Sequence, residues 1–200
     1  MLNRCNALVF SADGRWSEAF CTNLKSIGFG ETFCVCDFDD LERAISRQNI
    51  NFCYFSQTSH IDQIRAAMSA IRGYRDDELR FSPVILMARE ISRNSLSDYI
   101  AIGFDDIVRF PCTIDMLSSR TKRQLNTELR YYETESYFGP DRRNYFAANE
   151  EQLQQRTGTV PYRRHSIQRD VFKGIEITDV FDHKPPGFLD EENEKRSDAV

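Results

Sequence analysis

Residues 83–111, PVILMAREISRNSLSDYIAIGFDDIVRFP, decide the fold class of this chain. The stretch opens with a continuous apolar run, Pro83–Ala88, and closes with a second one, Asp106–Phe110. Between them, Ser92–Ile102 has the pattern of a helix, and Gly103 follows where a helix would stop. Two apolar strands separated by a helix predict a pair of parallel, buried strands.

The rest of the first 130 residues repeats this alternation. Further strands are predicted at Asn6–Ser11, Thr32–Cys36 and Asn51–Ser56. Helices are predicted at Arg15–Ile27, Leu41–Ile45 and Ile61–Ile71, and from Thr113 to about Tyr132. Five such repeats predict an α/β fold with a doubly wound, five-stranded parallel sheet, the flavodoxin-like arrangement.

The bulk composition is that of an ordinary globular chain. The 200 residues are 40% hydrophobic and 28% charged, with a net charge of −5, which does not favour nucleic acid as a partner. No apolar run reaches the roughly 18 residues of a membrane span, and the N-terminus lacks the pattern of a signal peptide. We therefore expect a cytoplasmic protein without a membrane segment.

The six cysteines do not form a recognisable ligand set. Cys34, Cys36 and Cys53 lie in apolar, strand-like runs, where cysteine acts as a small hydrophobic residue. No second Cys/His pair at zinc spacing accompanies Cys34 and Cys36. We therefore expect buried structural thiols, with no metal and no cofactor.

Two segments resemble the receiver domain of bacterial two-component signalling. Ala101–Pro111, AIGFDDIVRFP, is similar to the family's A-G-A-D-D-Y-L-x-K-P segment, and residues 82–88, SPVILMA, are similar to its fourth strand, I-P-V-I-M-L-T/S. The resemblance covers about residues 5–130. It implies a receiver domain, of the kind found in response regulators, over residues 1–132.

The same resemblance implies that the phosphorylation site is degenerate. A receiver needs an acceptor aspartate, two acidic Mg²⁺ ligands, a hydroxyl and a lysine before a proline, because only a metal and a cation neutralise the transferring phosphoryl group. The acidic pair falls on Ser11 and Ala12 with Asp13 one step late, the acceptor on Ser56, the hydroxyl on Ala88, and the lysine on Phe110 before Pro111. Phosphotransfer is therefore not expected. Phe110 is expected to be buried, and the resemblance implies a cis peptide before Pro111.

The remainder of the chain has a different texture. Residues 133–182 contain few aliphatic side chains and are predicted to form a partly ordered extension without a core of its own. Within it, Val171–Phe181 alternates like a strand and is expected to add to an edge of the receiver sheet or of a partner. Residues 183–200 are acidic and predicted to be disordered.

Two arginine pairs mark the extension: Arg142 and Arg143 in GPDRR, and Arg163 and Arg164 in VPYRR. The first motif resembles the G-P-D-R-R extensions of alphaproteobacterial receiver-like proteins. Adjacent guanidinium groups suit carboxylates and phosphates, which leaves three targets open. These are acids of the receiver domain (Asp76, Asp77, Asp105 or Asp106), a protein partner, and an anionic nucleotide such as cyclic di-GMP.

No catalytic fingerprint is present, so an enzyme is not expected. The sequence predicts a non-phosphorylatable, receiver-like regulatory protein that acts by protein–protein interaction. The resemblance implies a partner face on the fourth helix, fifth strand and fifth helix, including Tyr99, Ile107 and Leu117; Ile107 occupies the aromatic switch position. The alternative is an effector that binds cyclic di-GMP through Arg142, Arg143, Arg163 and Arg164.

Overall fold

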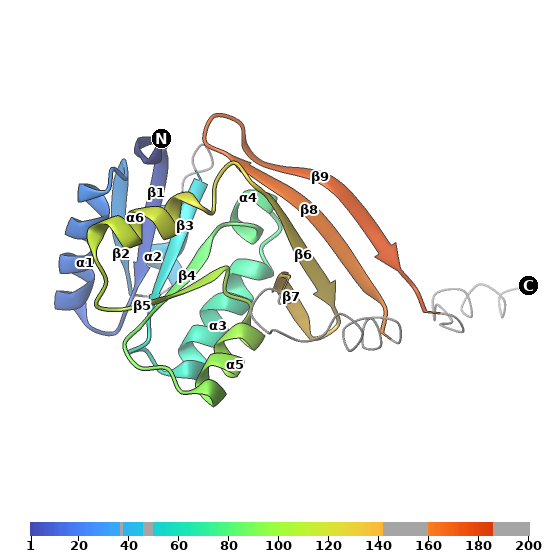
Figure 1. Ribbon diagram of the computed structural model, residues 1–200, viewed down its shortest axis with the longest axis horizontal. Helices are drawn as coiled ribbons and strands as arrows, with labels where there is room; N and C mark the ends of the chain where they lie inside the picture. The colour runs from blue at the N-terminus through green and yellow to red at the C-terminus, as the bar shows by residue number, and fades with distance from the viewer. Residues whose placement is uncertain (37, 46–49, 142–159, 186–200) are drawn as a thin grey trace, which may run out of the picture.

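The computed structural model describes residues 1–36, 38–45, 50–141 and 160–185, which build two sheets (Figure 1). The first is a five-stranded parallel sheet in the order β2-β1-β3-β4-β5. Its strands are β1 (Cys5–Phe10), β2 (Glu31–Val35), β3 (Ile50–Ser56), β4 (Val84–Ala88) and β5 (Asp106–Arg109). Its helical segments are η1 (Leu2–Arg4), α1 (Gly14–Ser26), α2 (Phe38–Ala44), α3 (Ile61–Arg72), α4 (Asp77–Arg80), α5 (Arg93–Ile102) and α6 (Ile114–Lys122). This order confirms the predicted flavodoxin-like fold.

The alternation of side chains along the strands separates two apolar layers. Ala7 and Val9 of β1 face one cluster, which includes Leu117 of α6, whereas Leu8 faces the other, which includes Tyr99 of α5. Successive side chains of a strand point to opposite faces, so both faces of the sheet must be covered by helices. The continuous apolar runs noticed in the sequence follow from this double burial.

The predicted long helix after Thr113 is wrong. Helix α6 ends at Lys122, and the chain turns at Asn126, which has a positive φ of 57° and donates its backbone N–H to the Arg169 carbonyl at 2.9 Å. Residues 128–134 then form strand β6 (Glu128–Thr134), in which Tyr131 is buried between more exposed neighbours. The expected boundary near residue 132 therefore falls inside a strand.

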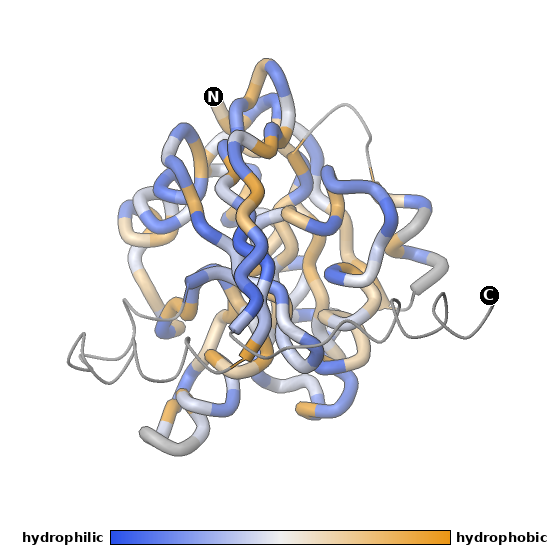
Figure 2. The backbone as a smooth tube through the Cα atoms, turned by 90° about the vertical axis from the view of Figure 1, so that its right-hand side faces the viewer, coloured by the Kyte–Doolittle hydropathy of each residue, from blue (hydrophilic) through white to orange (hydrophobic). Residues whose placement is uncertain are grey.

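The extension forms a second, antiparallel sheet in the order β7-β6-β8-β9. Its other strands are β7 (Tyr137–Pro140), β8 (Tyr162–Asp170) and β9 (Gly174–His183). Strand β9 contains most of the Val171–Phe181 run, but it pairs with β8 and not with an edge of the receiver sheet, which corrects the expectation. Figure 1 shows β8 and β9 as a long ribbon beside the first sheet, and Figure 2 looks from this side onto largely hydrophilic strands.

The second sheet obtains its apolar core partly from the receiver part. Phe81, which lies just before β4, packs edge-on against Tyr131 with ring centroids 5.3 Å apart, and Ile167 of β8 completes the buried cluster. Few aliphatic residues therefore suffice for the extension, because a buried aromatic ring from outside it fills the space between the strands.

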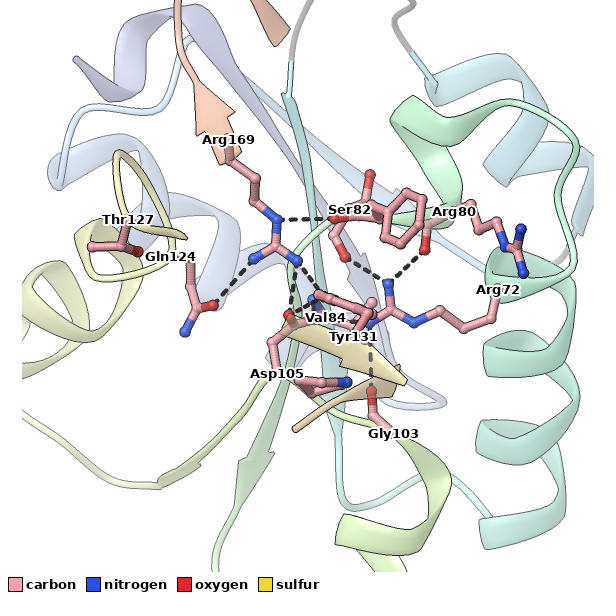
Figure 3. Close-up of polar contacts among 12 residues, drawn as sticks. Arg72, Arg80, Ser82, Val84, Gly103, Asp105, Gln124, Thr127, Tyr131 and Arg169 are labelled. Carbon is pink, nitrogen blue, oxygen red and sulfur yellow. Dashed lines mark hydrogen bonds and ion pairs between the residues drawn. The ribbon is translucent and has the colours of Figure 1, made fainter. Parts of the chain in front are cut away.

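A buried carboxylate joins the two sheets at the N-terminal ends of β4 and β5 (Figure 3). Asp105 Oδ1 pairs with Arg169 Nη2 of β8 at 2.7 Å, and Asp105 Oδ2 pairs with Arg72 Nη2 of α3 at 2.8 Å. Tyr131 also donates its hydroxyl to Asp105, and the Val84 backbone N–H donates to Oδ2 at 2.8 Å. Burial alone would raise the pKa of Asp105, but the charges of Arg169 and Arg72 outweigh it and hold the pKa below its ordinary value.

Most of the remaining donors of the two guanidinium groups bind backbone and amide oxygens. Arg169 donates to the Phe81 carbonyl at 2.9 Å and to Gln124 Oε1 at 3.2 Å. Arg72 donates to the carbonyls of Arg80 and Ser82 at 2.8 and 2.9 Å. Among the described residues, Arg72 Nε has no hydrogen-bond partner. The ion pairs and the other hydrogen bonds offset the cost of burying the two charges.

The cysteines follow the topology of the first sheet. Cys53 lies in the central strand β3 and is buried, but Cys34 and Cys36 are exposed, contrary to expectation, because β2 is an edge strand. Within the described ranges, no group of three or more potential metal-ligating side chains is found. No described helix combines enough length with enough apolar residues to cross a membrane.

The ion pairs of Asp105, which form the joint between the two sheets, predict that substitutions of two arginines of β8 differ strongly in their effect on stability. Arg169→Met should lower the free energy of unfolding by about 3 kcal/mol or more, because it removes one partner of a buried, hydrogen-bonded ion pair. Arg163→Met is the matched control. The Arg163 side chain is 52% exposed, so the melting temperature of this variant should stay close to that of the unsubstituted chain. Thermal and urea unfolding measure both, and equal effects would contradict the role of the joint.

Candidate functional site

The C-terminal ends of the parallel strands bring together the positions that the receiver resemblance assigns to phosphorylation. Ser56, at the end of β3, is buried and its hydroxyl lies 2.8 Å from that of Thr58. The Thr58 hydroxyl in turn lies 3.4 Å from that of Ser11, which follows β1. The site therefore presents a chain of three hydroxyl groups. Thr58 was missed in the sequence, because it matches no functional position of the receiver pattern.

The carboxylate of Asp13, next to the acidic-pair position, binds the backbone. Asp13 is the N-cap of α1, and its Oδ1 accepts a hydrogen bond from the Trp16 N–H at 3.1 Å. Its own N–H donates to Ser11 Oγ at 3.1 Å, and Ala12 beside it is exposed and contributes no ligand. Hydroxyl groups and a single capping carboxylate make a poor Mg²⁺ site, since Mg²⁺ binds proteins mainly through carboxylates.

Phe110 stands at the lysine position, and the Phe110–Pro111 peptide is cis. Its N–H donates to the carbonyl of the buried Ala88 at 2.7 Å, which holds the two positions side by side. The Phe110 ring packs edge-on against Trp16 with centroids 6.0 Å apart, and the Arg89 guanidinium lies 6.0 Å from the ring centroid. The ring is partly buried and packs against the apolar cluster that contains Leu117, so the expectation of a largely buried Phe110 agrees with the structure, although part of the ring stays exposed.

The residues expected on a partner face do not share a surface. Tyr99 and Leu117 are buried, at 7% and 3% exposed, and they belong to the apolar layers on opposite faces of the first sheet. Ile107 alone is partly exposed, on the edge strand β5. The resemblance assigned Tyr99 and Leu117 by the elements that carry them, but both side chains lie on the face of their helix that packs on the sheet.

The described arginine pair binds acids of its own sheet. Arg163 forms a two-pronged ion pair with Asp182 of β9, with Nε 2.6 Å from Oδ1 and Nη2 3.2 Å from Oδ2. Arg164 pairs with Asp179 at 3.0 Å. Of the three targets left open by the sequence, acids of the receiver domain are therefore not the partners of Arg163 and Arg164, because the register of β8 and β9 places carboxylates of β9 beside them.

The receiver acids have other partners. Asp105 binds Arg72 and Arg169, Asp106 binds Arg120 Nη2 at 2.6 Å, and Asp76 caps helix α4. An arginine of the extension does bind the receiver part, but it is Arg169, which stands alone in the sequence. The other pair, Arg142 and Arg143, lies outside the described residues.

Comparisons with known proteins identify the fold. No protein-family model matches the chain, and no curated protein matches it. A protein of Burkholderia pseudomallei described as pilus-assembly-related is similar in structure, with 16% identity over 62% of this chain and 90% of that one and a TM-score of 0.50. A chemotaxis response regulator of Vibrio cholerae has 15% identity over 60% of this chain and 97% of that one, with a TM-score of 0.48.

The receiver domain of a histidine kinase from Syntrophus aciditrophicus has 21% identity over 60% of this chain and 88% of that one, with a TM-score of 0.47. At such identities the likeness concerns the fold alone. The strand order and the apolar layers on both faces of the sheet give the class: the five-stranded part of this chain has the doubly wound, flavodoxin-like fold.

The partly exposed ring of Phe110 predicts that this position, which is a lysine in the receiver pattern, tolerates a charged side chain. Phe110→Lys should cost about 1 to 2 kcal/mol of unfolding free energy, because the contact with Trp16 is lost but the ammonium group can extend into water. Phe55→Lys, at a fully buried position of β3, is the control and should cost far more. Equal losses in urea unfolding would show that Phe110 is sealed inside the core.

Proposed function

We propose that this chain is a cytoplasmic, receiver-like regulatory protein that is not phosphorylated and acts through contacts with other proteins. The observation that carries the proposal is the buried Ser56 hydroxyl at the acceptor position, hydrogen-bonded to Thr58. A serine hydroxyl needs a base or a metal to attack a phosphoryl donor. Its described neighbours are hydroxyl groups, which supply neither.

The groups around Ser56 also argue against a switch driven by phosphate. A receiver responds to phosphorylation because a hydroxyl and a cation move toward the new charge. Here Ala88 has no hydroxyl, and the aromatic rings of Phe110 and Trp16 fill the cation position. Without a group that binds the two states differently, no population shift can follow. The receiver part should therefore present one fixed conformation.

A fixed receiver fold can act as a binding surface. Strand β5 and the start of α6, which follow each other in the chain, carry apolar side chains that reach the surface. Ile107 is partly exposed, Ile114 is 43% exposed and Met116 is 52% exposed. Exposed apolar side chains that gather in one contiguous patch mark protein contacts, whereas single scattered ones are ordinary surface. We propose this region, in place of Tyr99 and Leu117, as the partner surface of the receiver part.

The arginines favour protein contacts over a cyclic dinucleotide. Arg163 and Arg164 already bind Asp182 and Asp179. Asp182 neutralises the charge of Arg163 and accepts two of its hydrogen bonds. A nucleotide would have to displace both carboxylates. Binding of cyclic di-GMP is therefore the less supported alternative.

Acetyl phosphate tests the proposal. Incubation with acetyl phosphate and Mg²⁺ should leave the mass of the intact protein and the fluorescence of Trp16 unchanged, because the acceptor carboxylate and its metal ligands are replaced. A receiver domain that keeps all of these residues is the positive control in the same reaction. Stoichiometric phosphate on Ser56, Thr58 or Ser11 would overturn the proposal.

A further inference from the structure

Strand β9 is the outer strand of the second sheet and offers a long free edge. It runs over ten residues, Gly174–His183, and pairs with β8 on one side only. Among the described residues, no strand pairs with its other side, and Figure 1 shows it as the outermost strand. An edge of this length presents a row of unpaired backbone N–H and C=O groups, which is a template for another strand.

A register shift limits the regular part of this edge. Ser166 pairs with Asp179 but the next residue, Ile167, pairs with Ile177, so Thr178 is an extra residue that interrupts the ladder. The uninterrupted pairing toward the end of β9 therefore covers Asp179–His183. The central residue of this five-residue segment is Phe181.

An aromatic row on one face of the second sheet ends at Phe181. The Tyr132 and Tyr162 rings lie 5.4 Å apart across β6 and β8, and Tyr162 lies 6.4 Å from Phe181 and 4.8 Å from His183 on β9. The row stops at the free edge, where Phe181 is still 44% exposed although the Arg164 guanidinium lies 5.1 Å from its centroid. A second strand placed along the edge would cover this exposed ring.

We propose that the occupant of this edge is β9 of a second copy, paired antiparallel about Phe181. A two-fold axis through this position places Phe181 opposite the same residue of the other copy, so that the two aromatic rows join. The same register places Asp179 opposite His183 and Val180 opposite Asp182. No two like charges then face each other, and the two four-stranded sheets become one continuous sheet.

Charge favours this register over its neighbour. Shifting the axis by two residues, to Asp179, would set that carboxylate against itself and Asp182 against Glu176, which is destabilising because like charges would lie directly opposite. The axis at Phe181 avoids both contacts and adds an aromatic pair. The dimer holds or fails independently of whether the receiver part is phosphorylated, because the edge lies on the other sheet.

Cysteine cross-linking tests the register. Phe181→Cys should form a disulfide-linked dimer under mild oxidation, because residues directly opposite in an antiparallel pair have Cα atoms about 4.5 to 5.5 Å apart, within disulfide range. Ile177→Cys is the matched control, since it is similarly exposed on β9 but would lie about 26 Å from its symmetry mate, at roughly 3.3 Å per residue. The unsubstituted chain gives the background from the six native thiols.

Analytical ultracentrifugation supplies a measurement that does not depend on the thiols. The native chain should dimerise reversibly, and Phe181→Lys should raise the dissociation constant at least about tenfold, because two like charges replace an aromatic pair at the axis. Phe172→Lys, in the turn between β8 and β9, should leave it unchanged. A native chain that stays monomeric up to its solubility limit, or cross-linking of Ile177→Cys as fast as of Phe181→Cys, would overturn the proposal.

Discussion

The arrangement of the two sheets depends on the ion pairs that the buried Asp105 carboxylate forms with Arg72 and Arg169. Asp105 binds Arg72 from the end of α3 and Arg169 from β8, and these two side chains are only 5% and 0% exposed. Two buried guanidinium groups would be strongly unfavourable without this carboxylate between them, since a charge removed from water must be paired and hydrogen-bonded. Arg169 reaches this carboxylate only when the second sheet is docked. The buried charge of the extension is therefore neutralised by a carboxylate of the first sheet.

Asp105 and the positions around Ser56 lie at different ends of the first sheet. Asp105 lies just before β5, so the extension packs at the N-terminal ends of the strands, while Ser56 and Phe110 lie at the C-terminal ends. The packing at the joint is close: Gly103 has a positive φ of 100°, and a Cβ there would lie 2.8 Å from the Phe138 carbonyl oxygen of β7. The hydroxyl groups around Ser56 and the docked extension therefore lie at opposite ends of the first sheet.

The strands of the first sheet could be predicted from the sequence, whereas the second sheet could not. Buried parallel strands such as Val84–Ala88 are continuous apolar runs, and these are visible without any tertiary information. Strand β8 reads YRRHSIQRD, with Ile167 as its one aliphatic residue, and its burial depends on a contact between Arg169 and a carboxylate 64 residues away. An isolated arginine gives no signal of such a contact, whereas the conspicuous pair Arg163 and Arg164 binds acids of its own sheet.

If the Asp105 joint makes one cooperative unit of the two sheets, native-state hydrogen exchange will show it most directly. The slowest amides of β8 and the slowest amides of β4 should exchange with the same free energy, and that free energy should equal the value for global unfolding, because neither sheet can open without exposing the buried charges. Exchange of the β8 amides at a much lower free energy than those of β4 would show that the extension undocks by itself, and would contradict the account.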